Sequence, residues 1–285
     1  MLFKVVHTLN SILVISLLSG LMMGCRPSQT IATSDETQAV PSCHYTTQQL
    51  KTMKRYIAEH EKPGLDFLVE MMQKNQTLTV GENHFNLADK YFVADSLKQL
   101  KEKAGLAYLA IEIDRNSKDM ISDYANGKRD SLGFPALEYM IDKATEAGLE
   151  LVLINPVENG IDRDNAMFDY LNEDIFSKYP HAKVLVYVGN NHTNEGYPSL
   201  EGYFRLAKYL SDYTGNNNGS IMIMSPSSLC DPLARKEYTS PIGFEVDYSP
   251  FSEFTLYESY DYNDPTGSFS LITDGVVLLD EEVQQ

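Results

Sequence analysis

The sequence predicts an α/β domain in which a mostly parallel sheet, of about five or more strands, is covered by helices on both faces. Short apolar runs alternate with segments of helical periodicity at the spacing of β-α-β units. The strand-like runs are almost continuously apolar, which is typical of parallel strands buried on both faces. With 285 residues, 43% of them apolar, the chain is long enough for one sizeable core.

The N-terminus is predicted to direct export. An apolar run from Ile12 to Leu21 is too short to span a bilayer and suits a secretory signal peptide over residues 1–24. The sequence Leu21-Met-Met-Gly-Cys25 resembles a bacterial lipobox. This resemblance implies lipidation of Cys25, palmitate included, and an ordinary cleaved signal is the alternative. Arg26 after the cysteine favours the outer membrane.

We therefore expect a lipoprotein of the bacterial cell envelope, attached to the membrane through an N-terminal lipid anchor. Residues 25–44 are rich in Ser, Thr and Pro and predict a flexible tether. A single α/β domain is expected over residues 45–285. Cys43 and Cys230 would form a disulfide in an oxidising periplasm, or remain as two buried thiols.

The net charge excludes one class of partner. The chain carries a formal charge of -17, from 40 acidic and 23 basic side chains. Such a surface repels the phosphates of nucleic acids, so no nucleic acid partner is expected.

The elements of the domain follow from periodicity and from turn residues. Apolar spacing over residues 46–75 predicts two helices, divided at Pro63-Gly64. The strands are predicted at residues 77–80, 106–113, 149–154, 182–188 and 220–224. The helices between them are predicted at residues 87–103, which Gly105 ends, and at residues 162–179 and 200–213.

Two regions depart from this alternation. Residues 116–147 read as a helical insert in two pieces around Gly133-Phe-Pro. The Tyr-rich tail, about residues 226–285, has no helical stripe and predicts irregular and β structure, with an edge strand over residues 270–279.

Polar side chains follow several predicted strands at the point where each strand ends. The strand ends carry Gly81-Glu82-Asn83-His84, Glu112, Asn155 and Gly189-Asn-Asn-His192. Parallel strands emerge on one edge of a sheet, so these groups should converge. A carboxylate at the end of an apolar strand is costly unless it is paired, protonated or functional. The alternative is a purely structural role for these residues, in which Glu112 is a buried carboxylate with hydrogen-bond partners and His192 caps a turn.

A helix start adds a cation to this edge. Ile161-Asp-Arg-Asp-Asn-Ala-Met167 opens the helix after the third strand, where a helix N-terminus can stabilise an anion. Asp162 or Asp164 could equally cap this helix, and capping is compatible with Arg163 reaching the site.

These motifs, in this order, resemble the superfamily that joins erythromycin esterases, ChaN lipoproteins, and the TraB and TIKI proteins. The resemblance spans about residues 76–195, and the lipobox favours the ChaN-like branch. It implies an α/β sheet with inserted helices and a site in which Glu and His act on a bound water or metal. The residues implied are Glu82, His84, Glu112, Arg163, Asn165 and His192.

The expected activity is hydrolysis of an ester or peptide bond in a small-molecule or peptide substrate. His84 or Glu82 would be the general base, Arg163 would stabilise the oxyanion, and His192 would be an acid or second ligand. A metal version would bind Zn, Mn or Fe through His84, Glu112 and His192. The rival prediction is a haem- or iron-binding lipoprotein without catalysis. A serine nucleophile is not expected, because the sequence has no Gly-x-Ser-x-Gly motif.

Overall fold

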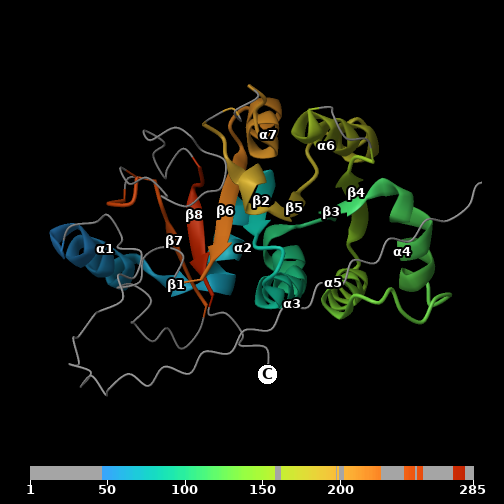
Figure 1. Cartoon of the computed structure of the whole chain (residues 1–285), viewed down its shortest axis with the longest axis horizontal. Helices are drawn as coiled ribbons and strands as arrows, with labels where there is room; N and C mark the ends of the chain where they lie inside the picture. The colour runs from blue at the N-terminus through green and yellow to red at the C-terminus, as the bar shows by residue number, and fades with distance from the viewer. Residues whose placement is uncertain are drawn as a thin grey trace, which may run out of the picture. The chain divides into compact units, whose positions relative to one another are not determined.

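An eight-stranded sheet runs through the part of the chain that the structure describes (Figure 1). The computed structural model describes residues 47–157, 162–196, 198, 202–225, 241–247, 249–252 and 272–279. The strand order is β1-β7-β8-β6-β2-β5-β3-β4. Among these strands only β7 runs against its neighbours, so the sheet is mostly parallel, as predicted.

The described strands are short and follow the apolar runs of the sequence. They are β1 (Lys62–Pro63), β2 (Thr77–Glu82), β3 (Tyr108–Asp114), β4 (Glu150–Asn155), β5 (Val184–Gly189), β6 (Asn218–Met224), β7 (Ile242–Glu245) and β8 (Gly275–Leu278). The described helices are α1 (Thr47–His60), α2 (Gly64–Lys74), α3 (Leu87–Ala104), α4 (Lys118–Ala125), α5 (Pro135–Glu146), α6 (Arg163–Leu171) and α7 (Leu206–Thr214). Short helical turns follow three elements: η1 (Arg115–Ser117), the π-turn η2 (Asn172–Phe176) and η3 (Asn190–Thr193).

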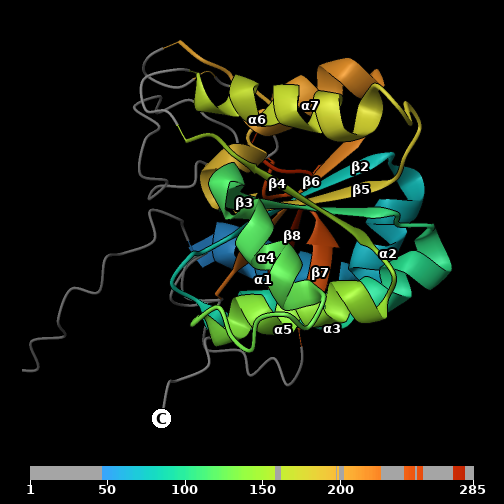
Figure 2. The same ribbon diagram turned by 90° about the vertical axis from the view of Figure 1, so that its right-hand side faces the viewer.

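Helices cover both faces of the sheet, as Figure 2 shows for α6 and α7 on one side and α3 and α5 on the other. Alternate strand residues supply the two cores, because successive side chains point to opposite faces. One face packs Leu78, Leu109, Leu185 and Ile221 under α2, α3 and α5. The opposite face packs Ala110 and Val186 under α6 and α7, and Met222 and Val276 under α1.

Capping residues fix the helix that follows β2. The side chain of Asn86 accepts a hydrogen bond from the backbone N–H of Ala88 at 3.1 Å, which caps α3 at its start. Gly105 ends the helix in the left-handed conformation, with φ 77°, and bonds back to Leu100 and Lys101. The predicted end of this helix at Gly105 is confirmed, and Pro63-Gly64 separates α1 from α2 as predicted.

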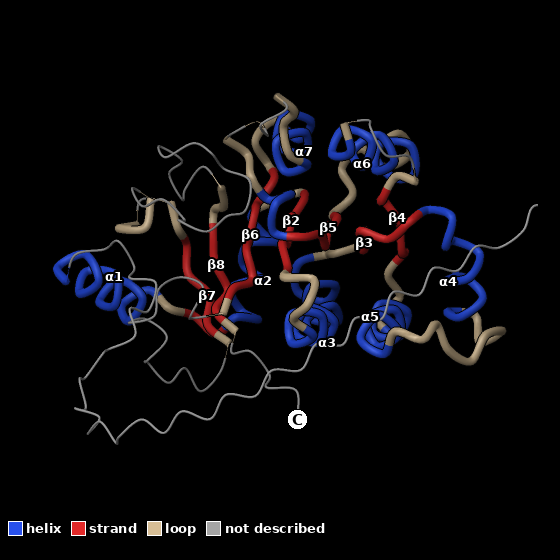
Figure 3. Tube along the Cα trace, in the orientation of Figure 1, coloured by secondary structure: helices blue, strands red, loops and turns tan. Residues whose placement is uncertain are grey.

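The structure corrects three of the predicted elements. The strand expected at an edge, residues 270–279, is β8, which lies between β6 and β7 (Figure 3). Its neighbour β7 comes from the Tyr-rich segment, which has no clear strand pattern. The helix predicted over residues 162–179 ends at Leu171 and continues as the π-turn η2, and α7 begins only at Leu206.

Part of the predicted helical insert belongs to the frame of the fold. Its second piece, α5, is the crossover between β3 and β4, and it packs beside α3 with Met140, Ile141 and Ala144 buried. The apolar stripe of α5 is therefore explained by the core.

Several predictions fall on residues that the structure does not describe. The signal peptide, the tether, Cys25, Cys43, Cys230 and most of the Tyr-rich tail lie outside the described residues. All of the described residues belong to one unit of the chain, Val40–Gln285. None of the described helices has both the length and the hydropathy that crossing a bilayer requires.

Candidate active site

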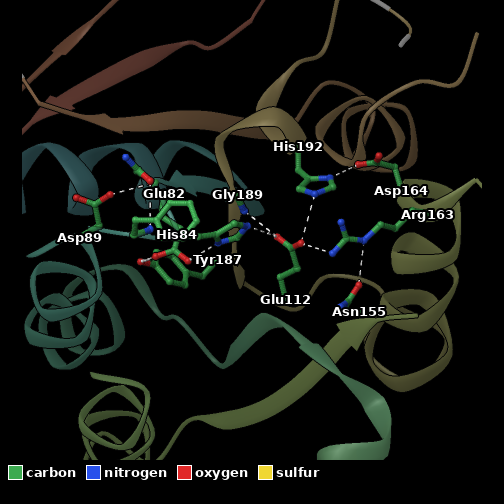
Figure 4. A network of polar contacts seen from close by, with 12 residues as sticks. Glu82, His84, Asp89, Glu112, Asn155, Arg163, Asp164, Tyr187, Gly189 and His192 are labelled. Carbon is green, nitrogen blue, oxygen red and sulfur yellow. Dashed lines mark hydrogen bonds and ion pairs between the residues drawn. The ribbon is translucent and has the colours of Figure 1, made fainter. Parts of the chain in front are cut away.

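The polar side chains predicted at the strand ends converge at one edge of the sheet (Figure 4). β5 lies between β2 and β3, and β4 lies beside β3, all in parallel. Their carboxyl ends therefore place Glu82, Glu112, Asn155 and Gly189 at the same edge. The turn η3 continues from β5 and brings His192 over Glu112. The predicted convergence is confirmed.

Glu82 is a buried carboxylate that several groups satisfy. Its Oε2 atom accepts a hydrogen bond from Nζ of Lys90 at 2.6 Å and another from the hydroxyl of Tyr187. Its Oε1 atom lies 2.9 Å from Nδ1 of His84. Burial, followed by the negative charge of Glu82, raises the pKa of Tyr187 well above 10, so its hydroxyl stays a donor. The positive charge of Lys90 compensates for the cost of burying the negative charge of Glu82.

His84 is held on one side and open on the other. Its Nδ1 atom faces Glu82, and 56% of its side chain is exposed to solvent. The Nε2 atom lies 3.9 Å from Oε2 of Glu112, beyond hydrogen-bond distance. The hydrogen bond to Glu82 raises the pKa of His84 above 6.5, although burial opposes it. The carboxylate fixes the ring orientation and leaves Nε2 for an incoming group.

Glu112 lies between His84 on one side and His192 and Arg163 on the other. Its Oε2 atom accepts from the backbone N–H of Gly189 at 2.8 Å, and its Oε1 atom accepts from Nη2 of Arg163 at 2.5 Å. Nε2 of His192 lies 3.5 Å from the same Oε1. Burial alone would raise the pKa of Glu112, but the contacts with His192, Gly189 and Arg163 together hold it at about 2. Glu112 is therefore an anion at neutral pH.

His192 is buried between two carboxylates. Its Nδ1 atom lies 2.5 Å from Oδ1 of Asp164, on the opposite side from Glu112. Burial disfavours its charge, but hydrogen bonds to Asp164 and Glu112 outweigh burial and raise its pKa to about 9. Asp164 also accepts from the backbone N–H of Leu206 at 2.8 Å, and Arg205 lies 3.6 Å from it. His192 is thus a buried cation that positions Glu112.

Arg163 extends from the first turn of α6. Its Nε donates to Oδ1 of Asn155 at 3.0 Å, and 49% of its side chain is exposed. Asp162 caps this helix by accepting from the backbone N–H of Asn165 at 3.1 Å. The side chain of Asn165 donates to Asp169 at 3.3 Å, along the helix and away from Glu112. The structure therefore brings Arg163 into the site and leaves Asn165 out of it.

The tentative metal ligands His84, Glu112 and His192 do not fit a metal ion in this arrangement. Arg163 and Gly189 already donate to Glu112, and both ring nitrogens of His192 face carboxylates, Nδ1 at 2.5 Å and Nε2 at 3.5 Å. In the described part of the chain, no group of three or more His, Cys, Asp and Glu side chains has the geometry of a metal site. No step of the chemistry below passes through a metal.

Sequence reasoning missed three side chains of this network. Lys90 and Tyr187 hold Glu82, and Asp164 orients His192. Tyr187 lies in a buried strand where it reads as core, and Asp164 reads as a helix cap. Tyr187 and Glu82 point to the same face of neighbouring strands, but this register is set by strand pairing and cannot be read from one sequence.

The stability of the fold is expected to depend on pH through Glu112. Its pKa in the folded state, about 2, lies below the ordinary 4.5. Its stabilising contribution is complete above pH 4.5 and is lost as pH falls through 2; it is on the order of 3 kcal/mol. Urea unfolding between pH 2 and 7 should show this loss in wild type and not in Glu112→Gln. Glu102→Gln, which changes an exposed carboxylate of α3, should keep the wild-type profile.

The fold is similar to several solved structures. A protein from Bacillus cereus has a TM-score of 0.57 and 11% identity, and the alignment covers 83% of this chain and 98% of that chain. A mutant of the erythromycin esterase EreC in its open conformation also has a TM-score of 0.57 and 11% identity, over 81% and 95% of the two chains. The chain has an erythromycin esterase-like fold.

The resemblance predicted from the sequence motifs is confirmed at the level of the fold. A ChaN protein of Campylobacter jejuni, solved with cofacial haem, is a weaker neighbour, with a TM-score of 0.39 and 10% identity over 75% and 91% of the two chains. No protein-family model and no curated protein sequence matches the chain. The similarity to these structures shows the fold alone, because one fold can carry many different functions.

Proposed function

We propose that the protein is a hydrolase of ester or peptide bonds in which His84 is the general base. The observation that carries this proposal is the pairing of buried Glu82 with a half-exposed imidazole whose Nε2 makes no hydrogen bond among the described residues. An oriented imidazole is the most frequent general base in enzymes. The erythromycin esterase among the structural neighbours supports this reaction class.

The proposed reaction needs only water and the side chains of this chain. Nε2 of His84 takes a proton from water as the water oxygen bonds to the carbonyl carbon of the substrate. The tetrahedral oxyanion then expels the alcohol or amine, which takes the proton from the imidazolium. Two of the five N–H donors of Arg163 are used by Glu112 and Asn155, so others can stabilise the oxyanion.

The proposal is tested by Glu82→Gln on a broad panel of 4-nitrophenyl esters and peptide amides. Glutamine removes the charge that orients and supports the imidazolium, so kcat/KM should fall by about 10²–10⁴-fold. Circular dichroism should show that the variant is folded. Glu102→Gln should retain full activity. The proposal fails if wild type hydrolyses no member of the panel, or if Glu82→Gln is as active as wild type.

Gly189 provides an independent test, because it leaves room for the imidazole. A Cβ atom at Gly189 would lie 2.8 Å from Nε2 of His84 and 3.6 Å from Oε2 of Glu112. Since the imidazole is an exposed side-chain end, Gly189→Ala should displace it with little loss of stability. Displacement of a reacting group by about 1 Å costs about 100-fold in rate. We expect a loss of this size in kcat/KM.

Gly81→Ala is the contrasting variant. A Cβ atom at Gly81 would lie 2.9 Å from the Cα of Asn190 and 2.7 Å from a methyl of Thr193, and the Asn190 backbone cannot easily move. Urea unfolding should therefore show a larger loss of stability for Gly81→Ala than for Gly189→Ala. The reverse order would contradict the assigned role of Gly189.

Haem or iron binding without catalysis stays a second prediction. Titration of the full chain with haemin, followed by absorbance, would show a Soret shift that saturates at a defined ratio if this prediction is correct. The side chains at the sheet edge favour hydrolysis, because both histidines there are paired with carboxylates.

We further propose that the protein is an envelope lipoprotein anchored through Cys25 in the outer membrane. The lipobox-like sequence before Cys25 supports this location. Labelling of expressing bacteria with a palmitate analogue should mark wild type and not Cys25→Ser. Membrane fractionation should then place the labelled protein with outer-membrane markers.

A further inference from the structure

A pocket of about 430 Å³ opens beside the proposed catalytic groups, between α3 and α5. One wall carries Glu82, His84 and Glu112, together with Lys90 and Tyr187. The remaining wall is almost entirely apolar. It is made of Leu87 and Tyr91 from α3, Ile111 and Ile113 from β3, and Phe134, Pro135, Ala136, Leu137 and Met140 at the start of α5. A small group of convergent polar atoms beside an apolar hollow is the usual form of a ligand site.

Large apolar side chains are exposed at the mouth of this pocket. Phe134, which lines the pocket, is 65% exposed. Leu87 is also exposed. Exposed apolar side chains around a pocket favour a binding role, because burial of a side chain of this size contributes about 1.5–3 kcal/mol.

The segment that carries Phe134 is fixed before any ligand arrives. The side chain of Glu138 accepts hydrogen bonds from the backbone N–H groups of Leu132 and Gly133 and from the hydroxyl of Ser131. Gly133 supplies the left-handed turn, with φ 82°, that places Phe134 at the N-terminus of α5. A wall whose backbone is ordered in advance loses less conformational entropy on binding.

The charged groups of the reactive wall are already paired with one another. Lys90 pairs with Glu82, and Arg163 pairs with Glu112, at 2.6 Å and 2.5 Å. The apolar wall contains no charged side chain. The reacting group should therefore be uncharged, with an apolar substituent next to it.

We infer that this pocket selects substrates in which an uncharged carbonyl carries an aliphatic chain or a single ring. The volume lies near the lower end of the roughly 300–1,000 Å³ of small-molecule pockets, which suits a chain of about six to ten carbons rather than a macrocycle. This inference names the substrate class of the proposed hydrolase and rests on that function for its chemistry, but the binding of an apolar group does not require catalysis.

The first test varies chain length. Full-length protein is assayed with 4-nitrophenyl esters of two to ten acyl carbons and with acetate esters of alcohols of matching length. In one series or the other, kcat/KM should rise about fourfold per methylene until the pocket is filled, the ratio expected from about 0.8 kcal/mol per buried CH₂. Rates that are independent of chain length in both series would overturn the inference.

A filled pocket should abolish this preference. Ala136 lines the pocket and is buried, so Ala136→Met occupies part of its volume. We expect the ratio of kcat/KM for the eight-carbon to the two-carbon substrate to fall at least tenfold. The matched control is Ala125→Met, on an exposed position of α4 outside the pocket, which should keep the wild-type ratio. An unchanged ratio in folded Ala136→Met would also overturn the inference.

The second test measures binding without catalysis. The chain contains no tryptophan, so Phe134→Trp introduces a single fluorescent reporter at the mouth. In the Glu82→Gln background, N-octylacetamide should shift its emission to the blue and saturate, with weaker binding of N-butylacetamide. If this occurs but no ester is hydrolysed, the pocket assignment stands and the hydrolase proposal falls. No spectral shift up to the solubility limit would refute the pocket.

Discussion

Replacement of His84 by alanine should lower kcat/KM for ester hydrolysis by about 10²–10⁴-fold, the usual contribution of a positioned general base. The physical reason is that Nε2 of His84 is the open nitrogen of the pair with Glu82. Glu112 is the alternative general base, because it is an anion with a pKa of about 2. Its Oε1 atom, however, already contacts His192 and Arg163, so it is less suited to accept a proton from water. Stopped assays with the best ester of the panel give the rate directly.

The pH dependence of the wild-type rate should identify the base. A general base must be unprotonated, so kcat/KM should rise with pH through the pKa of His84, which the hydrogen bond to Glu82 raises above 6.5. The midpoint should move down in Glu82→Gln. His181→Ala removes an exposed imidazole before β5 and is the matched control. A pH-independent rate in wild type, or equal losses in both histidine variants, would rule out this role.

Replacement of Asp164 by alanine should lower the free energy of unfolding by about 3–5 kcal/mol, because it leaves the buried His192 cation without the nearer of its two carboxylate partners. Asp164 is buried and accepts from both His192 and the backbone N–H of Leu206. The loss should be smaller at high pH, since His192 is neutral above its pKa of about 9. Urea unfolding at pH 7 and at pH 10 measures both values.

Asp169→Ala is the control for this stability prediction. Asp169 lies on the same helix, but it is exposed and contacts the side chain of Asn165. Its replacement should change the free energy of unfolding by less than about 0.5 kcal/mol, as is usual for exposed sites. Equal effects of the two replacements would contradict the network drawn around His192.

The location of the site could be predicted because it depends on strand ends. An apolar strand that ends in Glu82 or Glu112 marks both the sheet edge and the polar groups there, and this information is local in the sequence. The partners of these groups come from elsewhere. Lys90, on α3, donates to Glu82 at the end of β2. Asp164, on α6, contacts His192 on η3. Nothing in a single sequence distinguishes these side chains from solvated ones.

The position of β8 was unpredictable for a related reason. Its apolar run indicates a strand, but its neighbours are chosen by pairing across the whole chain. Arg163 and Asn165 show the same limit within one helical turn. Both were expected in the site. Only Arg163 points toward Glu112, because side chains two positions apart on a helix point in different directions.

The internal position of β8 has a consequence for the order in which the protein folds. β6 pairs with β2 on one side, and its other side stays unpaired until Gly275–Leu278 has been synthesised. The pairing of β1 with β7 likewise joins segments that are far apart in the sequence. Such distant pairings carry a large loop-closure entropy and slow folding. A nascent chain that has emerged through Met224 therefore exposes an unpaired, apolar strand edge, which favours self-association. We therefore expect a chain truncated after Met224 to self-associate more readily than the full chain, because β8 is missing from this edge.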